Sequence, residues 1–540
     1  MRVRPTLAPH TAWPESALPA GWRTAMDRLA TYVIERVDPD GAVRDPCHSR
    51  VLESALTLAL LRDIPGHADR AERITGYLQR RQATAHPLEG ALIAAACGGD
   101  RADARSSLDL DAYIAQAPDF TSGRKRANFE AMLIACGAAA GTEPAPDPTA
   151  FSSAGLHPWA EVQTTAVKLI WATAPGTPHR IDPRDVKLLL STQDRQDGIW
   201  EGNLLVHLSA LHALHRLGGH EDTVRRGVDR TLAHQRRDGG IPFFTDTDTW
   251  CTATAGVALL AASAPHGLIR TIADHLVQHQ KPNGGWSVTA AADVTDADDT
   301  SVVLELLQSL DNPAHYQAVD RGHQALLALR GPDGGFPTYI AGAPSEACMT
   351  AAVLNALSHQ QPADPAVLTS ALEYLAGQQR ADGTFPPDWS ASRLQTMFRA
   401  VLAASPFDQP HAHQLRSRTL AHILNTQNPD GGWGQQPDSA SDPVSTAYAL
   451  IALCHQADPR PVSSGVSYLM TKQNSEGSID SISDGIGPRP FVFRTPILSD
   501  IFTLMALGHI SHRAAPLPAG SPQIPLPAQP RTEGATVSCT

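Results

Sequence analysis

Long runs of small and branched apolar residues recur along the second half of the chain. Clear examples cover residues 252–264, 300–310, 349–359 and 444–456, where alanine, leucine and valine are frequent and proline is absent. Runs of this length exceed a typical strand, and their composition favours α-helix. The pattern therefore predicts a protein built from packed helices, with strands nearly absent.

A short phrase, Gln-x-x-Asp-Gly-Gly followed by an aromatic residue, separates these helices. Its copies, some of them degenerate, place a glycine at intervals of roughly 41 to 50 residues. Asp-Gly or Asn-Gly supplies the positive φ angle that ends a helix, and the aromatic residue can pack against the helix just finished. We expect Trp286, Phe336 and Trp433, which occupy the aromatic position, to be structural. The repeat glycines are Gly198, Gly239, Gly284, Gly334, Gly383, Gly431 and Gly477.

The repeat also predicts how the helices assemble. Each pair of helices can bury its apolar face only against neighbouring pairs, so about six units over 223–512 should close into a toroid of inner and outer helices. Less regular helical segments predict a second, degenerate helical barrel over 40–222. Residues 1–39 are expected to pack partly on the toroid. The Pro-, Ser- and Gly-rich tail, 513–540, is expected to be disordered.

Composition and charge exclude several classes of function. The 540 residues carry 43 Lys and Arg against 55 Asp and Glu, so no basic surface is expected for nucleic acid or anionic lipid. The first residues lack the apolar run of a secretory signal, and no long apolar stretch predicts a membrane span. We expect a cytoplasmic protein without stable membrane insertion, whose seven scattered cysteines stay reduced.

An acidic cluster opens one of the predicted helices, in the stretch ADVTDADDTSVV. It contains Asp293, Asp296, Asp298 and Asp299. One interpretation is structural, because acidic residues cap helix N-termini and such clusters are usually solvated. The other is catalytic, because neighbouring negative charges and low dielectric at the mouth of an apolar ring raise carboxyl pKa values. Asp298, flanked on both sides, would then be the proton donor.

Together, the repeats and the acidic motif resemble those of the class II terpene cyclases. Gln-Asp-Gly-Gly-Trp phrases with Asp296-x-Asp298-Asp299-Thr300 are similar to the pattern of squalene-hopene cyclases and bacterial drimenyl and copalyl diphosphate synthases. The resemblance covers most of the chain before the tail. It implies two α/α toroids of the terpene cyclase–prenyltransferase type. It also implies that Asp298 protonates an isoprenoid alkene, with Asp296 and Asp299 as its supports.

A carbocation formed in this way needs a dry cavity with aromatic faces, whose quadrupoles attract cations. Each aromatic residue in the repeat region is also open to a plain structural role in the core or beside a turn. The candidate wall residues are Trp250, Phe243, Trp389, Phe398 and Tyr448.

The chain lacks the DDxxD-type motif that ionises allylic diphosphates, because no acid follows Asp298-Asp299 at the needed spacing. The product is therefore expected to keep its diphosphate, held by Mg²⁺ and cationic side chains. Each of the candidate ligands also fits a role as a solvated surface charge. For magnesium they are Asp246 and Asp248, and for the diphosphate they are Arg489, Arg494, Lys281 and Arg393.

The expected substrate is an isoprenyl diphosphate and the expected product is bicyclic, since 5% aromatic residues suit a shorter cation cascade than that of squalene cyclases. The segment Arg50–Ala55 departs from the Ser-x-Tyr-Asp-Thr-Ala phrase of diterpene enzymes. This favours farnesyl diphosphate giving drimenyl diphosphate, with geranylgeranyl diphosphate giving a copalyl-type product as the close alternative. A phosphatase or a class I synthase would act next.

Two other classes of protein share the helical toroid. The β subunit of a protein prenyltransferase would need an Asp, Cys and His zinc site, and the short match Asp45-Pro46-Cys47 lies outside the repeats. A non-enzymatic interaction toroid would explain the repeats but would leave the acidic cluster without a role.

Overall fold

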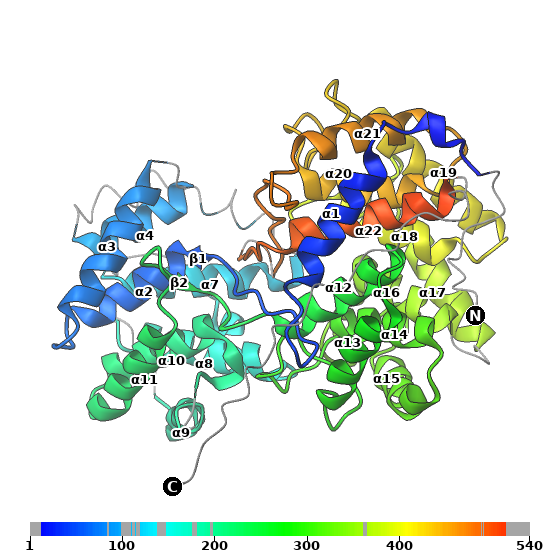
Figure 1. Cartoon of the computed structure of the whole chain (residues 1–540). Coiled ribbons are helices and arrows are strands. Elements are labelled where there is room, and N and C mark those ends of the chain that lie inside the picture. The colour runs from blue at the N-terminus through cyan, green and yellow to red at the C-terminus, as the bar shows by residue number, and fades with distance from the viewer. Residues whose placement is uncertain are drawn as a thin grey trace, which may run out of the picture.

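The computed structural model describes residues 12–83, 86–98, 119–137, 147–174, 181–194, 198–359, 364–487 and 491–514, together with Leu110, Ile114 and Arg489. Helices dominate these residues and gather into two bodies (Figure 1), which confirms the all-α fold with two helical domains. The predicted disordered tail lies outside the described residues from position 515 onward.

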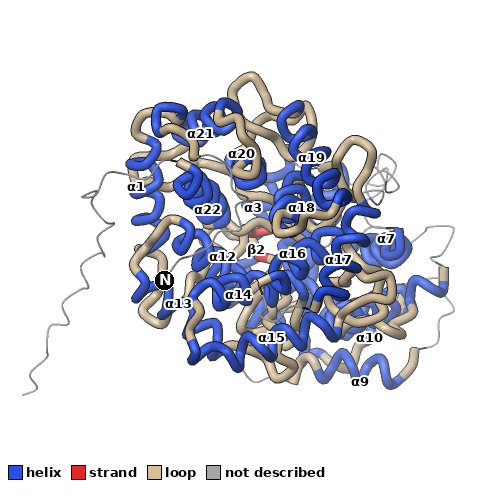
Figure 2. Tube along the Cα trace, turned by 90° about the vertical axis from the view of Figure 1, so that its right-hand side faces the viewer, coloured by secondary structure: helices blue, strands red, loops and turns tan. Residues whose placement is uncertain are grey.

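The larger body is a closed ring of inner helices surrounded by outer ones (Figure 2). Each inner helix contacts the next in chain order, and α22 returns to pack on α12. Inner helices such as α20 are buried along their whole length, which explains their apolar sequences. The inner helices are α12 (Asp248–Ala261), α14 (Ala297–Leu310), α16 (Ala347–Ser358), α18 (Leu394–Ala404), α20 (Pro443–Leu453) and α22 (Leu498–Arg513). The outer helices are α1 (Trp22–Ile34), α13 (His266–Gln278), α15 (Tyr316–Ala328), α17 (Pro365–Gln378), α19 (Pro410–Asn425) and α21 (Arg460–Thr471).

The smaller body is a second ring, in which α2, α4, α7, α8 and α10 contact one another in order and α10 returns to α2. Its inner helices are α2 (Val51–Leu61), α4 (Pro87–Cys97), α7 (Asp119–Ala135), α8 (Pro158–Ala172) and α10 (Leu204–Leu217). Outside them lie α3 (Ala68–Gln82), α9 (Pro183–Ser191) and α11 (Glu221–Ala233). Short 3₁₀ turns are η1 (Glu15–Ala17), η2 (Pro148–Phe151), η3 (Trp200–Gly202) and η4 (Pro313–His315).

A single two-stranded sheet is present among the described elements. Strand β1 (Ser49–Arg50) pairs antiparallel with β2 (Ile241–Pro242), with Ser49 opposite Pro242. The sheet joins the segment that enters the smaller body to the segment that leaves it.

The boundary between the two bodies lies later in the chain than the expected division at 222/223. Helix α11 packs on α10 and α2, and Phe243 and Phe244 belong to the hydrophobic core of the smaller body. The reason is the repeat phrase after α11, whose Gln235 side chain donates a hydrogen bond to Arg70 O in α3. This copy of the repeat closes the smaller ring, so that ring extends to Phe244.

The other repeat phrases join each unit to the outer helix of the next. The Gln280 amide donates to Gly284 O in its own turn and to Ala318 O in α15, both at 2.7 Å. In the last unit Gln473 donates to Ala25 O in α1 at 2.9 Å. Helix α1, from the start of the chain, therefore supplies the last outer helix and closes the ring.

The aromatic residues of the repeat phrase are structural, as expected. Trp286 and Trp433 are buried, and each indole donates a 2.7 Å hydrogen bond to a carbonyl of the preceding outer helix. Phe336 is also fully buried. The Trp286 N–H donates to Thr300 Oγ1 at 3.0 Å, so the threonine that ends the acidic motif anchors the turn before it.

Replacement of Gly284 by alanine is expected to destabilise the toroid. Gly284 has a φ of +91°, and an added Cβ would lie 2.4 Å from Arg321 O of the next outer helix. The backbone would have to shift, so we expect the free energy of unfolding to fall by at least about 3 kcal/mol. Gly98→Ala is the control, because Gly98 lies in the left-handed region, with a φ of +80° and a ψ of +19°, and nothing lies within 4 Å of the added Cβ.

The control should lose only about 1–2 kcal/mol, the usual effect of a side chain in the left-handed region. Denaturant unfolding of both variants measures the two losses. Equal losses would contradict the assigned role of the close backbone approach.

Candidate active site

A cavity of about 460 Å³ lies between the two bodies, a size that suits a small organic ligand. Side chains of α7, α8 and α10 in the smaller body line it, together with the first turns of α14, α16 and α22 in the larger one. The starts of several inner helices thus face the smaller body. Polar groups placed at those helix starts converge on one space.

The acidic trio Asp296, Asp298 and Asp299 lines this cavity at the start of α14. The Asp296 carboxylate caps the helix by accepting a 2.8 Å hydrogen bond from the Asp299 N–H. The structural and the chemical interpretations of the cluster therefore both apply. Asp296 and Asp299 are buried, whereas the Asp298 side chain keeps 17% exposure and is the most accessible of the three to a ligand.

Burial changes the acid strength of Asp296 and Asp299. Loss of hydration raises the pKa of Asp296 to about 7. The same cause, reinforced by the adjoining Asp296 carboxyl, raises the pKa of Asp299 well above its ordinary value. These two carboxyls therefore hold at least one proton near neutral pH. The arrangement keeps protons in the wall of a largely apolar cavity.

Arg399 of α18 completes the acidic site, and the sequence reasoning missed it. Its Nη2 lies 2.7 Å from Asp298 Oδ1, and its Nη1 donates to Cys348 Sγ at 3.3 Å. A guanidinium in this position stabilises the carboxylate that remains once Asp298 has given up a proton. The signal was present, because a lone arginine inside the apolar helix LQTMFRAVLAA needs a buried partner.

Glu201 of the smaller body holds the loop that leads into the acidic motif. One of its carboxylate oxygens, Oε2, accepts hydrogen bonds from the Asp293 N–H at 2.7 Å and the Val294 N–H at 3.2 Å. The indole of Trp159 donates to the same oxygen at 3.1 Å. Glu201 is buried with a φ of +56°, a strained backbone that a non-glycine residue keeps only where its surroundings enforce it.

Of the five expected wall aromatics, Trp250, Phe243 and Trp389 line the cavity. Phe398 borders a smaller cavity that also touches Asp298. Tyr448 stacks on Phe398 with ring centroids 5.0 Å apart. Phe398 thus faces the smaller cavity inside the ring, and the Tyr448 hydroxyl donates to Asp484.

Three further aromatic wall residues, which were not anticipated, group with the expected Trp389. Tyr339 lies at the centre of this group, with ring centroids 5.7 Å from Trp389, 5.8 Å from Trp159 and 4.2 Å from His157. All four side chains line the cavity. Because Tyr339 and Trp389 lie in turns of the larger body, and His157 and Trp159 belong to the smaller body, no motif in the sequence connects the four. The cavity wall thus presents several π faces near the acid.

Cationic side chains line the same cavity. Arg124 and Lys125 project from α7, and Arg489 comes from the loop before α22. Burial lowers the pKa of Lys125 to about 8. The buried Arg489 Nε has no hydrogen-bond acceptor among the described residues. Buried polar groups are normally paired, so these groups indicate a space for an anion.

Two neutral side chains of the smaller body also have buried nitrogen atoms that could bind a ligand oxygen. His157 Nδ1 and Gln163 Nε2 are buried without partners among the described residues, and both residues line the cavity. Loss of hydration lowers the pKa of His157 to about 4. The imidazole is therefore neutral, and a ligand oxygen would find uncharged donors beside the three cations.

The other expected phosphate-binding residues do not line this cavity. Lys281 Nζ donates to Ala290 O at 2.9 Å within the turn before the acidic motif. The Arg494 guanidinium donates to Ser483 O and supports a loop. Arg393 precedes α18, where its N–H donates to Gln435 O. Of the expected group, Arg489 alone reaches the cavity.

The expected magnesium ligands also have other partners. Asp248 accepts a 3.0 Å hydrogen bond from the Ala290 N–H, and Asp246 accepts one from the Thr247 N–H at 2.7 Å. Neither carboxylate lines the cavity. Within the described part of the chain no group of three His, Cys, Asp or Glu side chains is placed to hold a metal. The zinc site of a prenyltransferase is therefore not found there either, and Cys47 instead pairs with the backbone of Phe244.

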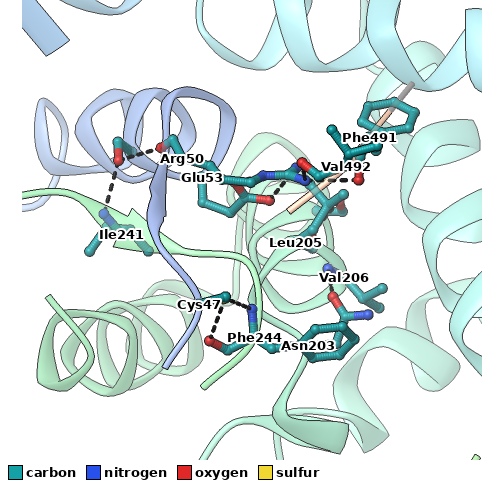
Figure 3. A network of polar contacts seen from close by, with 12 residues as sticks. Cys47, Arg50, Glu53, Asn203, Leu205, Val206, Ile241, Phe244, Phe491 and Val492 are labelled. Atoms are coloured by element: carbon teal, nitrogen blue, oxygen red, sulfur yellow. Dashed lines mark hydrogen bonds and ion pairs between the residues drawn. The ribbon is translucent and has the colours of Figure 1, made fainter. Parts of the chain in front are cut away.

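The segment Arg50–Ala55 fastens the two bodies together beside the cavity (Figure 3). The Arg50 guanidinium binds the buried Glu53 carboxylate through two 2.8 Å hydrogen bonds. Its Nη1 also donates to Phe491 O and Val492 O at 2.9 Å. The loop held in this way carries Arg489 and Phe491, which line the cavity. The segment thus positions a wall of the site.

Two α/α rings with a buried acidic trio and aromatic walls between them define a protonation-initiated, or class II, terpene cyclase. Residues 279–512 match the squalene-hopene cyclase C-terminal domain family. A drimenyl diphosphate synthase from Streptomyces showdoensis is 38% identical over 513 residues, which are 91% of this chain and 95% of that protein. One from Streptantibioticus cattleyicolor is 37% identical and covers 89% of this chain and 94% of its own. The chain belongs to the class II terpene cyclase family and is an enzyme.

A solved structure supports the fold independently. The ent-copalyl diphosphate synthase from Streptomyces platensis superposes with a TM-score of 0.61 at 19% identity, over 91% of this chain and 99% of that one. The likeness extends over both rings. None of the helices in the described residues is long and apolar enough to cross a bilayer.

Proposed function

We propose that this enzyme cyclises farnesyl diphosphate to drimenyl diphosphate and leaves the diphosphate attached. The observation that carries the proposal is the placement of Asp298, paired with Arg399, in the wall of a cavity that Arg124, Lys125 and Arg489 also line. The two relatives that align over nearly the whole chain are named for the same product. The chemistry is an isomerisation, so no atom is gained or lost overall.

In the proposed reaction the Asp298 carboxyl O–H donates its proton to the terminal alkene of the substrate. The π electrons form the new C–H bond and leave a tertiary carbocation, which the internal alkenes attack in turn to close two rings. Faces of Trp250, Tyr339 and Trp389 stabilise the positive charge as it moves. Arg399 stabilises the Asp298 carboxylate. Loss of a proton from the last cation ends the reaction.

The diphosphate is proposed to bind Arg124, Lys125 and Arg489. They belong to α7 and the loop before α22, whereas the acid begins α14, so a linear substrate can place its alkene and its anion against different walls. Charge-assisted hydrogen bonds from these cations would replace the hydration that the diphosphate loses. His157 and Gln163 offer further donors from the same body.

Magnesium is proposed to accompany the diphosphate. Glu346 and Asp388 line the cavity, and loss of hydration raises their pKa values to about 7 and about 6. Glu346 acts electrostatically on Lys125, and Asp388 on Arg489, so the two carboxylates lie in reach of the proposed anion site. Mg²⁺ would be held by one or both of them with diphosphate oxygens and water. When bound, it would supply positive charge to the diphosphate.

The proposal is tested by incubating the purified enzyme with farnesyl and geranylgeranyl diphosphates in parallel, with magnesium and with a chelator. We expect a bicyclic isomer of farnesyl diphosphate that becomes extractable only after phosphatase treatment, and slower turnover in the chelated sample. Release of a hydrocarbon with inorganic diphosphate would exclude retention of the ester. Preferential turnover of geranylgeranyl diphosphate would instead overturn the substrate assignment.

A further inference from the structure

A second cavity, of about 40 Å³, touches Asp298 from inside the larger ring. Its ionisable lining residues are Asp298, Glu305, Arg399 and His509. One water molecule needs about 10–15 Å³ of such space, so the cavity has room for about two or three. The proposed cyclisation uses Asp298 and Arg399 but gives no role to Glu305.

Helix α14 places Asp298, Ser301 and Glu305 along one face, because they are separated by three and then four residues. All three line the small cavity. Two helical turns separate Asp298 from Glu305 by about 10.5 Å along the helix axis. The Ser301 hydroxyl donates to Ala297 O at 2.6 Å and lies between the two carboxyls. Because its proton is already donated, the Ser301 oxygen can accept a hydrogen bond from water, and two or three waters are sufficient to bridge such a gap.

Glu305 itself is unusual, because it interrupts the apolar run VVLELL of an inner helix. Its Oε2 accepts a 3.3 Å hydrogen bond from Asn355 Nδ2 of α16. Loss of hydration raises the pKa of this carboxyl, while positive charge on His359 and Arg399 opposes the increase. On α22, burial lowers the pKa of His509 to about 4, so that imidazole adds no charge near neutral pH.

His359 connects this glutamate to the outside of the ring. It follows the last residue of α16 and is half-buried, with Nδ1 bonded to Asn355 O at 2.8 Å. The Asn355 residue therefore contacts both Glu305 and His359, through its side chain and its carbonyl. His359 also acts electrostatically on Glu305, so a titratable group lies near the glutamate on the side away from Asp298.

We propose that Glu305 returns a proton to Asp298 after each turnover, through water in the small cavity that the Ser301 hydroxyl oxygen helps to hold. The inference rests on the proposed role of Asp298 as the acid. Asp298 loses one proton to the alkene, and the Glu305 carboxyl O–H replaces it by transfer along the waters. Glu305, now a carboxylate, takes a proton from solvent through His359. The proton released by the final carbocation goes to solvent, so the cycle balances.

The test compares a single turnover with steady-state turnover in Glu305→Gln. A resting enzyme has time to protonate Asp298 by slow routes, so rapid quench with enzyme in excess should give a first-turnover rate within about 3-fold of the wild type. Steady-state kcat should fall by about 10- to 100-fold, since each later cycle waits for the proton. Glu373→Gln, an exposed glutamate of α17, is the matched control and should leave both rates unchanged.

Ala352→Val provides a second variant that removes no ionisable group. Ala352 lines the small cavity, and two added methyl groups would exclude its water. This variant should reproduce the loss of steady-state turnover with the first turnover preserved, even if the Glu305 variant fails to fold. Equal losses in both regimes, or no loss in either, would overturn the relay. Absence of cyclic product from the wild type, or full activity in Asp298→Asn, would instead remove the proposed function.

Discussion

Replacing Asp298 by asparagine is expected to lower turnover by at least about 10³-fold while leaving the fold intact. General acids contribute about 10²- to 10⁴-fold in enzymes at large. Asp296 and Asp299 hold a proton but are more deeply buried than Asp298, so we expect them not to replace it as the donor to the alkene. Asparagine preserves shape and removes the acidic proton. Product formation measured by mass spectrometry, together with the melting temperature, checks both parts of the expectation.

The matched control is Asp293→Asn, in the loop that leads into the same motif. The Asp293 side chain is largely exposed, and its backbone N–H rather than its carboxylate makes the contact to Glu201. Turnover should therefore stay within about twofold of the wild type. A comparable loss in both variants would indicate a general electrostatic effect of the loop and would contradict a specific acid at Asp298.

Asparagine substitution at Asp296 distinguishes its role as a helix cap from its role as an acid. Asparagine is as good a helix cap as aspartate, so Asp296→Asn keeps the hydrogen bond to the Asp299 N–H. Any loss of activity in that variant then reflects the missing carboxyl. The raised pKa values of this pair are physically tied to the position of the trio at the buried start of α14, between two bodies. The same residues on an exposed helix would only cap it.

The sequence predicted the repeat architecture because the residues that end each helix and contact the neighbouring units lie within one short phrase. The phrase from Gln280 to Trp286 combines a glutamine, a positive-φ glycine and an aromatic residue. The glutamine and the glycine contact the next outer helix, and the tryptophan contacts the preceding one. The acidic motif was equally readable, since capping and chemistry both place carboxylates at a helix start. These features depend on short segments of chain.

The rest of the site could not be read in this way, because it forms only when two rings meet. Arg124 and Lys125 belong to the degenerate barrel, where no repeat marks their positions. Only the folded structure shows that they line the same cavity as Arg489. Glu201 lies far from the motif in sequence, yet its carboxylate holds the loop before it. Lys281, which the sequence suggested as a diphosphate ligand, carries the same charge as Lys125 and differs from it only in position.

Single charged residues inside apolar helices are a more general signal of functional positions. Arg399, Glu305 and Glu53 each interrupt a nearly continuous apolar helix. A charged side chain in such a position must be paired or face a polar cavity, because burying it alone is costly. In the structure Arg399 pairs with Asp298, Glu53 with Arg50, and Glu305 with Asn355. Arg399 lies at the proposed acid, Glu53 at the segment that positions the cavity wall, and Glu305 at the small cavity.

Replacing Lys125 by methionine is expected to lower kcat/KM for farnesyl diphosphate by about 100-fold. A hydrogen bond from a charged donor is worth about 1.5–3 kcal/mol, and about 1.4 kcal/mol corresponds to a factor of ten. Lys281→Met is the control, because that ammonium binds Ala290 O in a turn outside the cavity. It should change the melting temperature more than it changes kcat/KM, and the reverse outcome would assign the diphosphate to Lys281.

The pH dependence of kcat/KM distinguishes the charge of Lys125 from its bulk. Burial lowers the pKa of Lys125 to about 8, so the ammonium that binds diphosphate is present below that pH and is lost above it. Loss of hydration raises the pKa of Asp296 to about 7, so the carboxyl pair of Asp296 and Asp299 loses a proton at a lower pH than Lys125 does. The logarithm of kcat/KM should therefore fall with a slope of about −1 above pH 7 and about −2 above pH 8. Lys125→Arg keeps its charge throughout this range, so its profile should retain the first decline and lose the second. A slope that still steepens above pH 8 in this variant would show that another group binds the diphosphate.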